Sequence, residues 1–181
     1  MSHIKTQAGF TLVEMMVAVG LGSLVILAAV VFSLYASRSY VAMTNYADLD
    51  EKGQLALDEF TQQIRQVLGV TSCTTNNGVI NSLTFNDYDG NPLTFTYNPS
   101  SKELYRIKSG VTNVLLTGCD SLQFNIYQRT PQPYTFDAIT TSVVTNCKLV
   151  EVTWSCSRNV LQGDKANTQS VQSSKVAIRS N

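Results

Sequence analysis

The hydrophobic and polar positions divide the chain into stretches with different patterns. The first stretch is an apolar run over residues 15–32, MMVAVGLGSLVILAAVVF, in which Ser23 is the one polar side chain. A helix of this length covers about 27 Å, close to the roughly 30 Å hydrocarbon core of a bilayer. The pattern therefore predicts one membrane-spanning helix near the N-terminus, within residues 10–37.

The next stretch, residues 38–69, changes to an amphipathic pattern without a turn signal. Its apolar positions have helical spacing and the positions between them are polar; the apolar set is Leu57, Phe60, Ile64 and Val67. We expect the helix to continue to about Leu68 and to end at Gly69. The more polar residues 38–52 would form a stalk.

From residue 70 onward the chain alternates between short strand patterns and turn residues. Two hairpins are predicted, 82–88 with 93–97 around Asp89-Gly90-Asn91-Pro92, and 103–108 with 113–116 around Ser109-Gly110. Further strands are expected at 121–128, 148–155 and 173–179, the first two separated by a polar stretch that contains Pro131 and Pro133.

Strands in succession without intervening helices indicate an antiparallel sheet, so the fold class is α+β, with the long N-terminal helix packed on the sheet. The sheet should contribute alternating apolar side chains to a core with the helix face defined above. The expected core residues of the sheet are Phe85, Phe95, Leu104, Ile107, Phe124, Ile126, Val150, Val152 and Trp154.

Charge and composition exclude several classes of function. The 13 Lys and Arg residues balance 13 Asp and Glu residues, and only 14% of the chain is charged. Without a basic cluster we expect no strong binding to nucleic acid. The single histidine, His3, lies in the first residues, so the body of the chain has no imidazole for a catalytic triad or a histidine-ligated metal.

The position of Glu14 decides between three interpretations of the apolar run. A secretory signal peptide has a shorter apolar region and a small-residue cleavage site, which SLYASRS at residues 33–39 does not provide. A plain membrane anchor gives Glu14 no purpose, because a carboxylate in a membrane helix is costly. A charge in this position indicates a function and requires a partner.

The third interpretation supplies that partner. Gly9-Phe10-Thr11-Leu12-Val13-Glu14, directly before the apolar run, resembles the processing site of type IV prepilins. The resemblance implies that prepilin peptidase of the inner membrane cleaves between Gly9 and Phe10 and methylates the new amine of Phe10. It also implies that Glu14, the fifth mature residue, pairs with the N-terminal amine of a neighbouring pilin subunit. Lys5 fits the basic leader of that family.

The resemblance implies a pilin-like lollipop with four parts: a cleaved leader over 1–9, a transmembrane and filament-core helix over 10–37, an amphipathic continuation over 38–69 and a β-sheet head over 70–181. The protein would sit in the inner membrane by one span, with its head in the periplasm, before it enters a pilus or pseudopilus. With its long head and few charges, the chain is similar to minor pilins of the PilW type or to J-type pseudopilins of type II secretion.

A membrane-anchored periplasmic enzyme or binding module is the alternative of a different class. We expect neither an enzyme nor a cofactor, because the head has no histidine, nucleophile elbow or glycine-rich phosphate loop. A carboxylate pair stays open, with its candidates distributed over strands and turns: Asp87, Asp89, Glu103, Asp120 and Glu151. Residues 87–91, DYDGN, lack the spacing of a calcium loop and are predicted to form a turn.

The four cysteines lie beyond the apolar run without CxxC spacing, which favours disulfides in an oxidising periplasm over a zinc site. Cys147 and Cys156 bracket one predicted strand of about 30 Å and cannot pair. If strands 121–128 and 148–155 are antiparallel neighbours, Cys119 faces Cys156. We therefore expect a Cys119–Cys156 bridge, which leaves Cys73 to pair with Cys147.

Overall fold

The computed structural model describes residues 9–130, 135–139, 141–158 and 168–179, and the chain forms two compact units, residues 1–41 and 42–181. The leader residues before Gly9, with His3 and Lys5, lie outside the described residues. The same holds for Pro131 and Pro133 in the polar stretch before the second half of the sheet.

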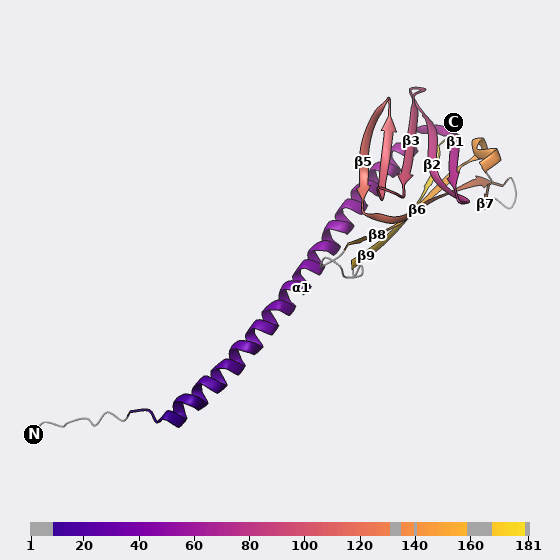
Figure 1. Cartoon of the computed structure of the whole chain (residues 1–181). Coiled ribbons are helices and arrows are strands. Elements are labelled where there is room, and N and C mark those ends of the chain that lie inside the picture. The colour runs from indigo at the N-terminus through magenta and orange to yellow at the C-terminus, as the bar shows by residue number, and fades with distance from the viewer. Residues whose placement is uncertain (1–8, 131–134, 140, 159–167, 180–181) are drawn as a thin grey trace, which may run out of the picture. The chain divides into compact units, whose positions relative to one another are not determined.

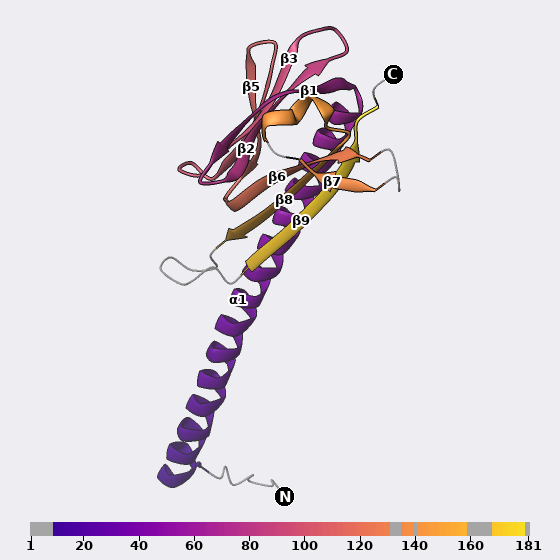
Figure 2. The ribbon, with the colours of Figure 1, turned by 90° about the vertical axis from the view of Figure 1, so that its right-hand side faces the viewer.

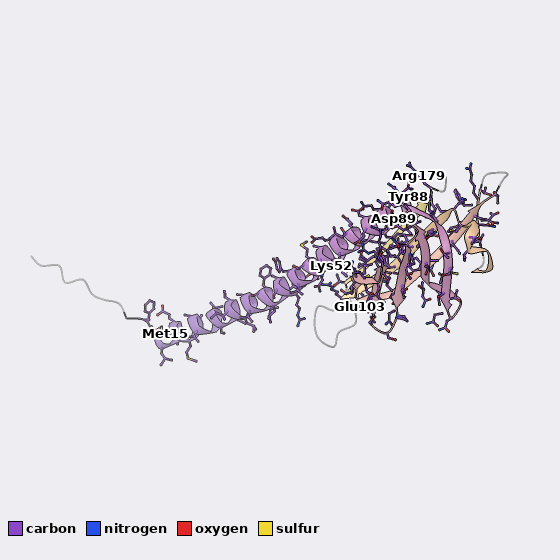
Figure 3. All side chains as sticks on the ribbon, turned by 90° about the horizontal axis from the view of Figure 1, so that it is seen from above. Met15, Lys52, Tyr88, Asp89, Glu103 and Arg179 are labelled. Carbon is purple, nitrogen blue, oxygen red and sulfur yellow. The ribbon has the colours of Figure 1, made fainter. Side chains whose placement is uncertain are left out.

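The one α-helix of the described residues, α1, comprises Leu12–Arg65 (Figure 1). Its part in the first unit is exposed along its whole apolar run, with Val25 and Ile26 exposed by 69% and 67%. In Figure 3, Met15 marks the first turns of this part. By length and composition α1 is the helix in the described part of the chain that could cross a membrane.

Within the second unit, α1 packs against the sheet with one stripe of side chains. The stripe consists of residues spaced three or four apart, namely Leu49, Gly53, Ala56, Phe60 and Ile64. Phe60 lies at its centre, with its ring 4.9 Å from that of Phe95 and 6.1 Å from that of Phe124. The predicted amphipathic helix is confirmed, although its member Leu57 is only partly buried against the core.

The prediction that the helix runs to Leu68 was wrong. The helix ends at Arg65, where the Gln66 amide donates to the Gln63 carbonyl at 3.0 Å, and strand β1 (Val67–Asn76) begins almost at once. Val67 is buried as predicted, but it reaches the core from β1. β-branched residues and a partner strand favour extended backbone in this segment.

The sheet of the described residues is antiparallel throughout, with its strands in the order β5-β4-β3-β2-β6-β8-β9, while β1 pairs with β2 and β7 with β6. This confirms the α+β class. The further strands are β2 (Val79–Asp87), β3 (Pro92–Asn98), β4 (Glu103–Lys108), β5 (Val111–Thr117), β6 (Cys119–Arg129), β7 (Phe136–Ala138), β8 (Leu149–Arg158) and β9 (Thr168–Ala177), and a 3-10 helix η1 (Thr141–Asn146) precedes β8.

Two groups of strands make up this sheet. Strands β1 to β5 form a series of hairpins, and β6, β8 and β9 run side by side along α1 (Figure 2). The two groups meet at one residue pair, Ile80 of β2 with Phe124 of β6. Near this meeting point β2 exchanges its neighbour, because its residues from Ser82 onward pair with β3 instead.

Both predicted hairpins are confirmed, and the turn at residues 87–91 closes with a bond from the Gly90 amide to the Asp87 carbonyl at 2.9 Å. The second turn places Ser109 and Gly110 at φ of 51° and 78°, which a glycine adopts without strain. Strands β1 and β7 and the 3-10 helix η1 were not predicted, and β9 begins five residues before its predicted start at residue 173.

The predicted core of the sheet is confirmed with one exception. Phe85, Phe95, Leu104 and Val150 have no exposed surface, and Trp154 is 1% exposed. Ile107 was wrongly placed in the core, because it lies only half-buried on β4 opposite the exposed Thr112 of edge strand β5.

Candidate functional site

The N-terminal segment before α1 presents its backbone openly. Gly9 and Phe10 precede the helix, Phe10 is 84% exposed, and a Cβ atom added to Gly9 would meet no atom within 4 Å. No described residue therefore covers the peptide bond between them. A protease that binds the chain at this bond would meet backbone outside any helix or strand, which no described residue covers.

Thr11 and Glu14 close the first turn of α1 with reciprocal hydrogen bonds. The Thr11 amide donates to Glu14 Oε2 at 2.8 Å, and the Glu14 amide donates to Thr11 Oγ1 at 3.3 Å. The Thr11 hydroxyl also donates to Glu14 Oε2, at 2.9 Å. This is a capping box, which satisfies amides that the start of a helix leaves unpaired.

The capping box uses one carboxylate oxygen of Glu14 and leaves the other free. Glu14 Oε1 has no hydrogen-bond partner among the described residues. Glu14 is also the one carboxylate between Phe10 and Asp48. A cation outside the chain could therefore reach Oε1 while the cap stays intact. The role of Thr11 was not predicted, although the spacing Thr-x-x-Glu is the sequence signature of a capping box.

The cysteines of the head lie in the arrangement that the strand order predicts. Cys119 and Cys156 occupy paired positions of β6 and β8, are both buried, and have their Sγ atoms 2.6 Å apart. All four cysteines are free thiols in this structure. The predicted juxtaposition of Cys119 and Cys156 is thus confirmed, and the covalent bond stays a prediction.

The other two cysteines belong to neighbouring elements. Cys73 lies half-buried on β1, Cys147 lies buried directly after η1, and β1 packs on η1. The Cys147 thiol donates to the Leu149 carbonyl at 3.3 Å. Burial raises the pKa of both thiols, so neither has the thiolate character of a catalytic nucleophile. Their pairing stays a prediction.

The candidate carboxylates of the head are held by separate partners. Lys108 Nζ lies 2.6 Å from buried Asp87 Oδ2 and holds the pKa of that carboxyl below its usual range. Lys102 Nζ lies 2.7 Å from Asp120 Oδ1. Glu151 accepts from the Tyr127 hydroxyl at 2.6 Å, a bond that lowers the pKa of the carboxyl.

Two candidate carboxylates remain. Glu103 accepts a hydrogen bond from the Tyr105 hydroxyl, and Asp89 is exposed. Asp89 and Tyr88 lie near Arg179 (Figure 3), and all three are among the residues that line an open hollow of about 390 Å³. Within the described residues no three His, Cys, Asp or Glu side chains are grouped to hold a metal ion.

The comparison with protein families concerns the N-terminal segment. Residues 4–30 match the family model of the prokaryotic N-terminal methylation motif. The match includes Gly9, Phe10 and Glu14 and supports a type IV pilin-like, or prepilin, protein, as the resemblance of the segment implied. No curated protein matches the chain. The long apolar helix followed by an antiparallel sheet agrees with a pilin-like architecture.

Proposed function

We propose that this chain, a type IV pilin-like protein by its N-terminal motif and architecture, is a minor pilin that is assembled into a filament through α1. The observation that carries the proposal is Glu14. It is a lone carboxylate at the start of an exposed apolar helix, it has one oxygen free, and it follows the Gly9-Phe10 bond by four residues.

The exposed apolar half of α1 needs an apolar environment. Large side chains are exposed along it from Leu12 to Tyr35, far more than an isolated soluble chain presents. The membrane supplies this environment before assembly, and the corresponding helices of other subunits supply it in a filament. The chain is therefore anchored in the inner membrane by α1, and we place its head in the periplasm.

Within such a bundle Glu14 requires a cation. Prepilin peptidase, by cleaving after Gly9, creates the amine of Phe10 on every subunit and methylates it. The amine of one subunit and Glu14 of its neighbour are each costly in a dry bundle, and pairing them compensates part of that cost. The free Oε1 of Glu14 is the acceptor in this pair.

The test compares Glu14→Ala with Glu51→Ala, a matched removal of an exposed carboxylate further along α1. Mass spectrometry of membrane-extracted protein should show a methylated Phe10 N-terminus for both variants. Sheared filaments, or cross-linked complexes with other pilins, should contain the Glu51→Ala chain and little of the Glu14→Ala chain. An uncut Met1 start in cells with active peptidase, or equal incorporation of both variants, would refute the proposal.

A J-type pseudopilin of type II secretion is the alternative with the same N-terminal chemistry. Deletion of the gene separates the two: loss of pili with normal secretion supports the minor pilin, and loss of secreted enzymes with normal pili supports the pseudopilin. The processing and assembly of the chain through Glu14 are the same in both cases.

A further inference from the structure

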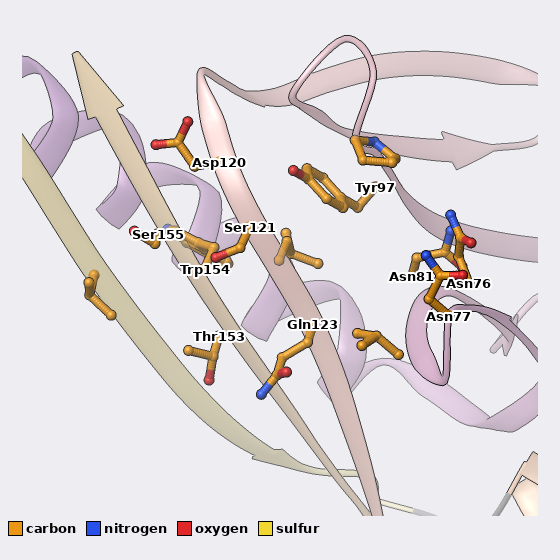
Figure 4. A pocket seen from close by; sticks show the side chains of 14 residues that line it. Asn76, Asn77, Asn81, Tyr97, Asp120, Ser121, Gln123, Thr153, Trp154 and Ser155 are labelled. Atoms are coloured by element: carbon orange, nitrogen blue, oxygen red, sulfur yellow. The ribbon is translucent and has the colours of Figure 1, made fainter. Parts of the chain in front are cut away.

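A hollow of about 490 Å³ opens in the head where the two groups of strands meet (Figure 4). One side of it comes from the β1–β2 hairpin and the end of β3, with Asn77, Asn81 and Tyr97. The other side comes from β6 and β8, with Gln123 and Thr153. Its volume falls within the range of about 300–1,000 Å³ that is typical of sites for small molecules.

Seven of the fourteen lining residues carry neutral hydrogen-bonding side chains, set in a surface that is otherwise mostly apolar. They comprise the side-chain amides of Asn76, Asn77, Asn81 and Gln123 and the hydroxyls of Ser121, Thr153 and Ser155. No Lys or Arg lines the hollow, and its one charged residue, Asp120, already binds Lys102 and accepts from the Ser157 hydroxyl. An anion would find no countercharge here, and a lipid tail would leave the amides unpaired.

One side-chain atom beside the hollow lacks a hydrogen bond, and one residue of β6 turns its backbone groups towards the hollow. The Oδ1 atom of Asn81 is buried and has no hydrogen bond in the described part of the chain. On β6, the Ile126 carbonyl accepts from the Ile139 amide at 3.0 Å, on the side away from β8. Alternate residues of a strand direct their backbone groups to the same side, so those of Leu122 also point away from β8, towards the hollow.

An added peptide strand does not fit this opening. β2 pairs with β6 at Phe124, and a bulge interrupts β6 between Cys119 and Ser121. Between the bulge and Phe124, the free edge of β6 offers only the backbone N–H and C=O of Leu122. Addition of a peptide strand uses a row of such groups. A compact ligand with many hydroxyl groups matches the paired donors and acceptors of the amides better.

We propose that this hollow binds a neutral saccharide unit, with Asn81 and Gln123 as its main hydrogen-bonding side chains. Neither the anchoring of α1 nor the assembly through Glu14 is needed for such binding, so the inference is independent of the proposed function. The one tryptophan of the chain, Trp154, is among the lining residues but only 1% exposed, so its fluorescence reports whether the head stays folded, and calorimetry measures the binding.

The test titrates the full chain, solubilised in lauryldimethylamine oxide, with the neutral trisaccharides maltotriose, cellotriose and triacetylchitotriose at millimolar concentrations. Calorimetry and Trp154 fluorescence are followed together. A detergent without a sugar headgroup is required, since maltoside and glucoside headgroups would compete. At least one trisaccharide should bind saturably, and the Asn81→Ala/Gln123→Ala double variant should bind it about tenfold more weakly, which corresponds to one or two lost hydrogen bonds.

Gln62→Ala/Asn113→Ala is the matched control, because both side chains are exposed and lie outside the hollow. It should bind like the unmodified chain. Gln123→Ala alone changes an exposed position of β6 and keeps the test valid if the double variant misfolds. Three results would overturn the proposal: no saturable binding of any trisaccharide, equal affinity in the pocket variants, or binding restricted to inorganic phosphate or to an eight-residue peptide of alternating threonine and valine.

Discussion

The two parts of α1 have the same backbone and opposite surroundings. From Leu12 to Val41 the helix exposes its side chains all round, and they are apolar over most of this length. From Ala42 to Arg65 it buries one stripe under the sheet, and its other faces are mostly polar, with Met43 and Leu55 as exposed apolar exceptions. The described residues thus leave the apolar side chains of the first part uncovered, whereas the second part is stabilised by the chain's own sheet.

This difference shows that helix formation and helix burial are separate properties of the sequence. Gly20 and Gly22 have open space around their Cα atoms, whereas a Cβ atom at Gly53 would approach the side-chain amide of Gln172 to 2.4 Å. The glycines of the first part thus contact no other described residue, whereas the missing side chain of Gly53 lets Gln172 of β9 approach the helix. Substitutions in the two parts should therefore affect different measurements.

Two matched isoleucine truncations should show the largest difference. Ile64 has no exposed surface, and Ile64→Ala should lower the free energy of unfolding of the head by about 2–5 kcal/mol. Ile26 is 67% exposed, and Ile26→Ala should leave it nearly unchanged. Denaturation of the detergent-solubilised chain, followed by Trp154 fluorescence, measures both. Equal losses would mean that the two parts are not independently stabilised.

The predicted Cys119–Cys156 disulfide should stabilise the head alone. Closing a loop of this length contributes about 2–4 kcal/mol to the free energy of unfolding, which a reductant should remove. The Cys119→Ala/Cys156→Ala variant should lose this part of the reductant response, while Cys73→Ala/Cys147→Ala keeps it. Peptide mapping of the oxidised protein gives the connectivity, and a link from Cys119 to Cys73 or Cys147 would contradict the pairing.

The ion pair of Asp87 and Lys108 should make the stability of the head depend on pH. The pKa of Asp87 is lowered in the folded state, so the pair stabilises above the unfolded value of about 3.9 and its contribution is lost as the pH falls through the folded pKa. Asp87→Asn should lower the free energy of unfolding by about 1–2 kcal/mol at pH 7. The loss stays this small because the Lys108 side chain is 32% exposed, so water can hydrate its charge when the carboxylate is removed.

Urea is the appropriate denaturant for this measurement, because guanidinium salt screens the pair. The difference between Asp87→Asn and the unmodified chain should shrink below about pH 4. Asp89→Asn, an exposed neighbour in the same turn, should have almost no effect at either pH. A constant difference at all pH values would show that Asp87 acts through its shape or its bond to the Tyr88 amide instead.

The sequence predicted the parts of the fold that depend on local patterns. The helical spacing of Phe60 and Ile64 and the turns at residues 87–91 and 109–110 are local, and the structure confirms them. The end of α1 was missed because Val67 and Leu68 continue the helical pattern, while the pairing of Val67 and Gly69 with β2 stabilises this segment as a strand. Asn77-Gly78, at φ of 51° and 80°, was the hairpin signal that could have revealed β1.

The candidate sites divide in the same way. Gly9, Phe10 and Glu14 are close in sequence, so a short motif was sufficient to find them. The hollow beside Trp154 is assembled from six strands and a hairpin turn, and Asn81, whose Oδ1 lacks a hydrogen bond, is an ordinary strand residue in the sequence. Sites of this kind depend on where β2 leaves β3 for β6, which no local pattern encodes.

The smallest expected effect concerns the first turn of α1. Thr11→Val keeps the side-chain shape but removes the hydroxyl that accepts from the Glu14 amide, which should destabilise the turn by about 1 kcal/mol. Amide exchange of Glu14 and Met15 in detergent micelles should accelerate about fivefold. Ser23→Ala is the control, since its hydroxyl donates to a carbonyl in mid-helix at 2.7 Å and caps no helix end. The free energy of unfolding of the head should be unchanged in both variants, because fraying of the helix at Thr11 removes no contact of the buried stripe. A shift of the unfolding transition followed by Trp154 fluorescence would show that the two parts of α1 are coupled.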